Sequence, residues 1–304
     1  MKFDLILTNP PFQDSTNRGK TPHKLWIDFT KAAFTRFLEP GGFLHQVSPA
    51  SFMSPSNKVL QIFKDFRVIR LDLTTSSYFP EVGSSFAHYL IQNHLDSSEV
   101  TTLITNQGES KLRLDDDVFY LPTDLSSISL SIHSKFIFRQ KVNLPVKWDY
   151  VTCHNILLSR SDSLSKTQTK AHQFPVFHTN SQIWWSSIRQ DFANLKKVIW
   201  TRSGYFKPFF DNGSLGGTDM AYYVTVSTDR QGNSLSNNLN LLLPQYIMKT
   251  AKWSGFGNEK VFVRLPQLPD KMLTDDEMFR YFDLTLEECD YVRNVMAKSS
   301  GKNK

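Results

Sequence analysis

The chain has 304 residues, of which 40% are hydrophobic and 21% are charged, and its formal net charge is +6. This composition predicts a globular protein with a sizeable core and excludes an intrinsically disordered chain. The excess of cations suits a polyanionic partner such as a nucleic acid. Two distant cysteines, Cys153 and Cys289, argue against a disulfide framework and for a reducing, cytoplasmic location. We find no signal peptide and no apolar run near the ~20 residues of a membrane span, so no membrane partner is expected.

The first 95 residues alternate between strand-like and helix-like patterns. Short apolar runs predict strands, whereas apolar residues at helical spacing predict amphipathic helices. The second helix is expected to start at Ser54, a good N-cap residue that a proline follows. Such alternation predicts an α/β sheet that is parallel at least in its first part. We expect strands at 3–7, 43–47, 68–73 and 86–92, and helices at 24–38 and 54–66.

The pattern changes after residue 95. Residues 96–150 resemble short strands with polar turns. Segments 158–171, 211–219 and 230–238 are rich in Ser, Gly or Asn and are predicted to be loops.

The C-terminal part has a helical pattern again. Thr274–Glu277 and Thr285–Glu288 each have the spacing of a capping box, in which a Thr and a Glu satisfy each other's backbone N–H groups. We therefore expect a helix to begin at each of them.

Asn9, Pro10, Pro11 and Phe12 directly follow the first predicted strand. In open α/β sheets, ligands bind at the carboxyl ends of the strands. Methylation of an exocyclic base amine needs acceptors for the amine protons, and the side chain of Asn9 and the backbone carbonyl of Pro10 supply two. Proline adds no competing N–H donor. Phe12 offers a face for a flipped base. The alternative is a proline-rich turn that only closes a strand.

The stretch FDLILTNPPF resembles motif IV of the amino-methyltransferases that use S-adenosylmethionine. It is most similar to N6-adenine DNA methyltransferases of restriction–modification systems that carry a TaqI-like C-terminal specificity region. The resemblance implies a partial Rossmann-like methyltransferase sheet, the catalytic-motif half, in residues 1–110. An α+β target-recognition region would follow in residues 111–304. Further similar segments are Leu38–Ser56, Phe79–Val82, Ser85–Ala87, Trp253–Gly257 and Tyr281–Val292.

The resemblance implies catalytic roles for Asn9, Pro10 and Phe12, with Pro11 shaping the turn. Phe79 and Phe86 are candidates for the second face of the target-base pocket, and ordinary core aromatics are the equal alternative for both.

The resemblance also implies S-adenosylmethionine as the cofactor, held by a glycine-rich FxGxG loop and a following acidic residue. Only Met1 and Lys2 precede the first strand, and neither 213–217 nor 254–257 follows a convincing strand. We expect the cofactor site to be incomplete in this chain, with a second chain or subunit supplying the loop beside an open, apolar strand edge. A truncated remnant and a repacked edge are the alternatives.

Cations and aromatic residues mix in residues 141–210, which predicts contact with double-stranded DNA. For any single residue, a solvated surface position is the alternative. The histidines have no metal-ligand spacing, so no metal site is expected. The candidate DNA contacts are Lys147, Arg189, Lys196, Lys197, Arg202 and Lys207.

The interpretation that follows is an enzyme, a site-specific DNA adenine N6-methyltransferase or its catalytic or specificity subunit. A catalytically inactive DNA-binding specificity or decoy protein derived from such an enzyme is one alternative. RNA and protein-glutamine N-methylation are others, because Asn-Pro-Pro-aromatic motifs serve these substrates too.

Overall fold

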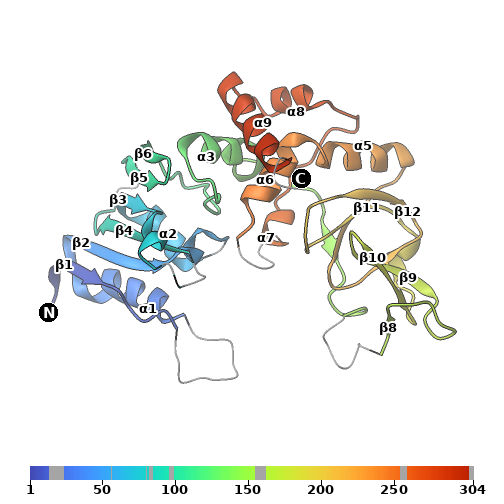
Figure 1. Cartoon of the computed structure of the whole chain (residues 1–304), viewed down its shortest axis with the longest axis horizontal. Coiled ribbons are helices and arrows are strands. Elements are labelled where there is room, and N and C mark those ends of the chain that lie inside the picture. Colours follow the sequence, from blue (N-terminus) through green and yellow to red (C-terminus); the bar gives the residue numbers. More distant parts are fainter. Residues whose placement is uncertain are drawn as a thin grey trace. The chain divides into compact units, whose positions relative to one another are not determined.

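The computed structural model describes residues 1–13, 24–55, 57–79, 81, 85–95, 99–154, 162–253 and 259–300. The chain forms two compact units, Met1–Ser134 and Lys135–Lys304 (Figure 1). The resemblance described above implies a boundary at residue 110. The later boundary arises because the intervening segment turns back onto the first unit, where the Leu121 N–H donates to the Met53 carbonyl at 2.9 Å. None of the helices in these described ranges combines the length and apolarity that a membrane crossing requires.

The first unit is built on a six-stranded sheet in the order β1-β2-β4-β3-β5-β6. β1 and β2 are parallel, as the alternating pattern predicts. β4 lies between β2 and β3 and is antiparallel to both, so the sheet is mixed rather than parallel. The strands are β1 Phe3–Thr8, β2 Leu38–Pro49, β3 Arg67–Asp72, β4 Phe86–Gln92, β5 Thr101–Thr105 and β6 Gly108–Leu112.

Helices α1 (Leu25–Ala32) and α2 (Lys58–Asp65) accompany this sheet, and α1 continues as a π-helical turn over Ala33–Phe37. Their apolar side chains pack on one face of the sheet. The Phe63 ring of α2 meets the Tyr89 ring of β4 edge to face at 4.9 Å. Gln46 donates to Thr30 of α1 at 2.8 Å. The face that the helices cover is therefore both apolar and hydrogen-bonded.

Helix α2 begins later than the expected start at Ser54. The Asn57 side chain caps the helix by accepting from the Val59 N–H at 2.9 Å. Ser54 instead donates to the Ser51 carbonyl at 2.7 Å, at the end of the 3-10 turn Ala50–Met53. A further helix, α3 (Ser127–His133), lies where the sequence suggested only short strands and turns.

The second unit contains two four-stranded sheets, in the orders β13-β9-β10-β8 and β12-β11-β14-β7, and several helices. A shared apolar cluster formed by Phe177, Phe192, Ile199, Ala221 and Tyr223 joins the two sheets. The strands are β7 Lys147–Trp148, β8 Leu164–Ser165, β9 Phe174–Thr179, β10 Gln182–Ser186, β11 Lys196–Thr201, β12 Phe209–Asn212, β13 Gly216–Gly217 and β14 Ala221–Thr225. The helices are α5 Asp229–Leu239, α6 Leu242–Thr250, α7 Glu259–Phe262, α8 Asp275–Tyr281 and α9 Leu286–Ser300.

Residues 230–238, which the sequence suggested were a loop, lie within helix α5. Thr228 caps this helix by accepting from the Gln231 N–H. Gly232 packs so closely on the Phe210 ring that an added Cβ would lie 2.1 Å from a ring carbon. Gly232 therefore allows the helix to pack closely on Phe210 and does not form a turn. Both predicted capping boxes are confirmed, at Thr274–Glu277 and Thr285–Glu288.

Candidate active site

The Asn9–Phe12 segment lies at the carboxyl edge of the first unit's sheet. Thr8, the last residue of β1, pairs with Gln46, so the chain continues alongside the end of β2. β4 begins at the same edge, because Phe86 pairs with Pro49. The segment therefore occupies the edge where ligands bind in open α/β sheets.

Three aromatic residues that are distant in the sequence come together here. The Phe12 and Phe86 ring centroids are 5.2 Å apart, and those of Phe79 and Phe86 are 4.9 Å apart. Phe86 is only 4% exposed, whereas Phe12 and Phe79 are half-buried. Phe86 therefore supports the other two rings, and these two retain accessible surface for a planar ligand.

Within the motif itself, burial differs from residue to residue. Pro10 is buried, which anchors the turn against the unit. Asn9 and Pro11 are exposed. The amide of Asn9 is thus accessible to a ligand at the sheet edge, next to the half-buried ring of Phe12.

The second aromatic ring is held by the turn that follows β3. Phe79 ends the 3-10 turn Thr75–Tyr78, and its N–H donates to the Ser76 carbonyl at 3.0 Å. The Ser76 hydroxyl accepts from the Phe86 N–H at 2.7 Å. This serine fastens the turn to the first residue of β4, which fixes Phe79 beside Phe86. Residues 80 and 82–84 of the similar segment lie outside the described residues.

A polar cluster that sequence reasoning missed lies at the end of β3. Asp72, 5% exposed, accepts from the backbone N–H and hydroxyl of Thr74 at 2.8 and 2.6 Å. His88 lies 3.6 Å from the same carboxylate, and its ring meets His45 edge to face. Partial burial, together with His88, lowers the pKa of His45. Asp72 orders the turn that leads to Phe79. The sequence offered one signal for this role, because Asp72 is an acidic residue at the end of a strand.

The candidate DNA contacts of the second unit differ in their availability. Lys147, Arg189 and Lys207 are exposed. Arg202 pairs at 3.3 Å with Asp219, whose side chain is 0% exposed, whereas Lys196 forms a surface ion pair with Asp229 at 2.7 Å. Surface pairs of this kind are weak, so Lys196 can exchange its partner for a phosphate at little cost. These residues remain candidates.

Lys197 must be removed from the candidate DNA contacts. Its side chain is 0% exposed, and its ammonium group donates to Asp211 at 2.6 Å and to the carbonyls of Phe192, Ala193 and Leu195. Burial alone would raise the pKa of Asp211, but hydrogen bonds from Lys197 and Ser214 outweigh it and hold this pKa below its usual value. Lys197 is thus an internal structural cation.

The described loop 213–217 does not fit the glycine-rich cofactor loop that the resemblance implies. An added Cβ at Gly216 would lie 2.4 Å from the Gln190 side chain, and one at Gly217 2.7 Å from Ala221. These glycines allow close packing within the protein, not the approach of a ligand. The other candidate loop, 254–257, lies outside the described residues. In the described ranges, no group of three or more His, Cys, Asp or Glu could hold a metal ion.

No protein-family model and no curated protein matches the chain. Solved structures to which it is similar are restriction–modification enzymes. The M protein of the type I restriction enzyme EcoKI has 21% identity and a TM-score of 0.25 over 30% of this chain and 21% of its own. The type IIL enzyme MmeI, in complex with DNA, has 7% identity and a TM-score of 0.40. The similarity covers 95% of this chain and 54% of MmeI. The type IIG endonuclease BpuSI has 10% identity and a TM-score of 0.35. The similarity covers 95% of this chain and 49% of BpuSI. The chain thus spans between 21% and 54% of these proteins.

Proposed function

We propose that this chain provides the catalytic motif and the recognition region of a site-specific DNA adenine N6-methyltransferase. The substrate would be an adenine flipped out of double-stranded DNA. The observation that carries the proposal is the position of Asn9–Phe12 at the carboxyl edge of β1, with Phe12 against Phe86.

The motif can orient an exocyclic amine. The exposed Asn9 side chain and the Pro10 carbonyl are two acceptors at adjacent residues. Hydrogen bonds from both amine protons would fix rotation about the C–N bond and leave the nitrogen lone pair free to point at the methyl donor. Fixing a reacting group in this way removes part of the entropic barrier of a bimolecular reaction.

The aromatic cluster can hold the flipped base. Flipping costs a few kcal/mol, and stacking of a base on an aromatic ring returns about 1–3 kcal/mol. Phe12 is half-buried over the buried Phe86, so its ring is both accessible and rigidly supported. Stacking on Phe12 together with the two hydrogen bonds would therefore offset most of the cost of flipping.

S-adenosylmethionine would supply the methyl group in this proposal. Because the described loop 213–217 does not fit its glycine-rich loop, we propose that a second polypeptide contributes that loop. The exposed cations Lys147, Arg189 and Lys207 support duplex DNA as the substrate, since phosphate contacts supply most of the non-specific affinity.

The test is methyl transfer to plasmid DNA by the complex of this chain with its cofactor-binding partner. Asn9→Ala should lower kcat by about 100-fold or more, because an acceptor that positions the amine is lost. The affinity for DNA should stay within about twofold of the wild type. Asn106→Ala is the matched control, because Asn106 is an exposed asparagine in the β5–β6 turn.

Normal turnover of Asn9→Ala would exclude the proposed role of Asn9. Mass spectrometry of the digested product should show N6-methyladenine. Another methylated base would exclude adenine as the target, and DNA binding without any methylation would favour the inactive DNA-binding protein.

A further inference from the structure

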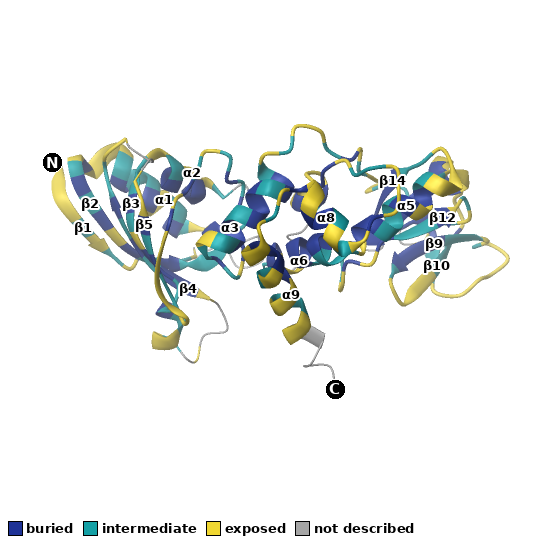
Figure 2. Ribbon diagram, turned by 90° about the horizontal axis from the view of Figure 1, so that it is seen from above, coloured by how far each residue is buried: buried dark blue, intermediate teal, exposed yellow. Residues whose placement is uncertain are grey.

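A polar segment of the second unit, residues 166–173, connects β8 to β9 (Figure 1). β8 and β9 lie on opposite sides of β10, and each is antiparallel to it. The two strands are therefore parallel to each other, so the segment has to cross β10 to reach β9. Residues 166–171 are all exposed, whereas β9 is buried over Val176, Phe177 and His178 (Figure 2). The crossing segment thus adds almost no side chain to the core.

The start of the segment rests on a stack of rings. The Lys166 ammonium group lies 5.9 Å from the centroid of the Trp184 ring, within the range of a cation–π contact. Trp184 in turn stacks on the His178 ring, and the two centroids are 3.8 Å apart. His178 is 8% exposed, and its Nδ1 is hydrogen-bonded to the Thr218 hydroxyl at 2.9 Å. The first residue of the segment is therefore attached to a buried and hydrogen-bonded support.

Hydrogen bonds within the segment and to its neighbours fix the backbone. The Ser165 hydroxyl donates to the Thr167 carbonyl at 2.6 Å and accepts from the Thr167 N–H at 3.2 Å. The His172 ring bonds to the Thr169 hydroxyl at 3.0 Å and to the Asp162 carbonyl at 2.9 Å. The Thr169 N–H also donates to the His172 carbonyl at 3.2 Å. The exposed segment is thus held in shape without apolar packing.

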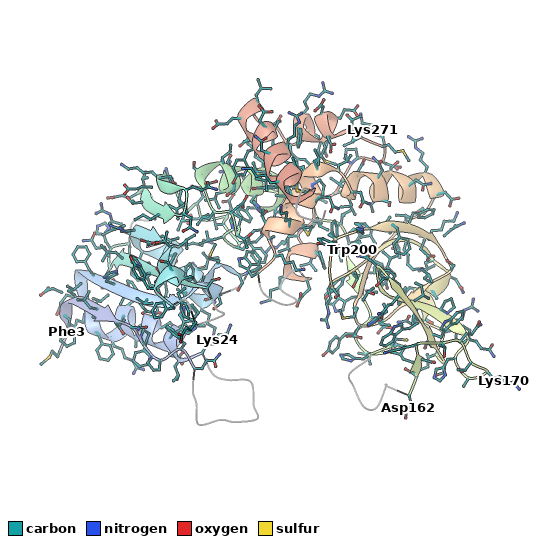
Figure 3. The ribbon with its side chains drawn as sticks, viewed as in Figure 1. Phe3, Lys24, Asp162, Lys170, Trp200 and Lys271 are labelled. Carbon is teal, nitrogen blue, oxygen red and sulfur yellow. The ribbon has the colours of Figure 1, made fainter. Side chains whose placement is uncertain are left out.

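Two side chains of the segment remain available to a ligand. Among the contacts that the described residues make, none involves the Gln168 amide. Lys170 takes part through its carbonyl, which accepts from Gln173 at 2.9 Å, and Figure 3 shows Lys170 at the margin of the second unit. Residues 166–173 contain two lysines and no acidic residue, which suits a polyanion. A loop that is already fixed also loses less entropy when it binds.

We propose that residues 166–171, which we call the reading loop, enter the major groove of duplex DNA and determine part of the recognised sequence. The Gln168 amide reads one base pair, and Lys170 contacts a neighbouring phosphate. Duplex DNA as the ligand rests on the proposed function, and the inference deepens that function by naming a residue that sets the recognised sequence.

The chemistry of the Gln168 side chain selects the base pair. A carboxamide offers an N–H donor and a carbonyl acceptor side by side. Adenine presents the complementary groups in the major groove, the N7 acceptor and the N6 amine, whereas guanine presents two acceptors there. Gln168 therefore favours an adenine–thymine pair, which is distinct from the target adenine that leaves the helix. The Lys170 ammonium group has no such directional pattern, so its contact strengthens binding to every sequence.

Selection of bound duplexes from a randomised pool by the full chain, followed by sequencing, tests the reading loop. The assay needs neither S-adenosylmethionine nor methyl transfer. The wild type should select a motif that contains the adenine–thymine pair. Gln168→Ala should reduce the preference at that one pair by about tenfold or more and keep the other positions of the motif. Gln107→Ala is the matched control, because Gln107 is an exposed glutamine in the β5–β6 turn, and it should leave the whole motif unchanged.

The salt dependence of binding separates the two side chains. Lys170→Ala should weaken binding to all sequences alike and reduce the log–log slope with salt by about 0.9. A wild type without sequence preference, a Gln168→Ala motif identical to that of the wild type, or a preference lost equally at every position would overturn the proposal. A Tm equal to that of the wild type shows that Gln168→Ala still folds. Asn9→Ala should keep the motif while it loses methylation, so the reading loop and the proposed function can fail separately.

Discussion

The buried ion pair between Lys197 and Asp211 yields a prediction about stability. In Lys197→Met, a side chain of similar length replaces the ammonium group, and the Asp211 carboxylate stays behind with its side chain 2% exposed. Three carbonyls also lose the hydrogen bond from the ammonium group. The variant should therefore be much less stable.

The size of the effect follows from the partners that Asp211 retains. Removal of one member of a buried ion pair costs about 3–5 kcal/mol. The Ser214 and Leu215 N–H groups still donate to Asp211, at 3.2 and 3.3 Å, so we expect a loss near the lower limit, about 3 kcal/mol. The double variant Lys197→Met/Asp211→Asn removes the uncompensated charge and should recover at least about 1 kcal/mol.

Urea unfolding followed by tryptophan fluorescence measures these free energies. Lys196→Met is the matched control, because the adjacent lysine pairs with Asp229 at the surface, with side chains 40% and 56% exposed. Its expected loss is below about 1 kcal/mol. If the two single variants differ by less than about 1 kcal/mol, the reasoning about burial is refuted. The folded Lys197→Met variant should also bind DNA with the same affinity as the wild type.

Three further predictions concern helix packing, pH and salt. Gly232→Ala should destabilise by about 1–3 kcal/mol in thermal melts despite the better helix propensity of alanine, because the new Cβ would clash with Phe210; a gain in stability would contradict this packing. Burial lowers the pKa of His133 from 6.5 to about 3, so His133 folds neutral and stability should be lost as the pH falls from about 6.5 toward 3. Urea titrations over this range should show a flatter profile for His133→Gln, and an unchanged profile would rule out His133 as the cause. Duplex affinity should fall steeply with salt, and Lys147→Ala should reduce the log–log slope by about 0.9, whereas a flat salt response would exclude a basic binding face.

Local sequence signals were sufficient to predict the elements whose structure depends on residues that are neighbours in the sequence. An apolar run stopped by two prolines predicts β1 and the position of Asn9 at its end. The capping boxes at Thr274 and Thr285 predict two helix starts correctly, because their hydrogen bonds span only three residues.

Features that depend on distant residues could not be predicted in the same way. The residues next to Lys197 predict a cation at the surface. Its burial depends on Asp211, which is 14 residues away in the sequence. Helix α5 contains a glycine and several asparagines, residues that predict a loop. The packing of Gly232 against Phe210, which the local sequence does not reveal, accompanies the helix instead. The aromatic cluster joins three separate loops and strands, so sequence supplied Phe12, Phe79 and Phe86 as candidates but not their contact.

The insertion of β4 between β2 and β3 sets an order of events on the ribosome. β2 and β3 have no hydrogen bonds to each other, because each pairs with a different side of β4. While β4 is still inside the exit tunnel, the β1–β2 pair and β3 are separate pieces with open edges. The sheet closes only when Gln92 has emerged, and this closure also brings Phe86 to Phe12. A nascent chain arrested before Phe86 would therefore expose unpaired apolar strands, which is the kind of surface that chaperones bind.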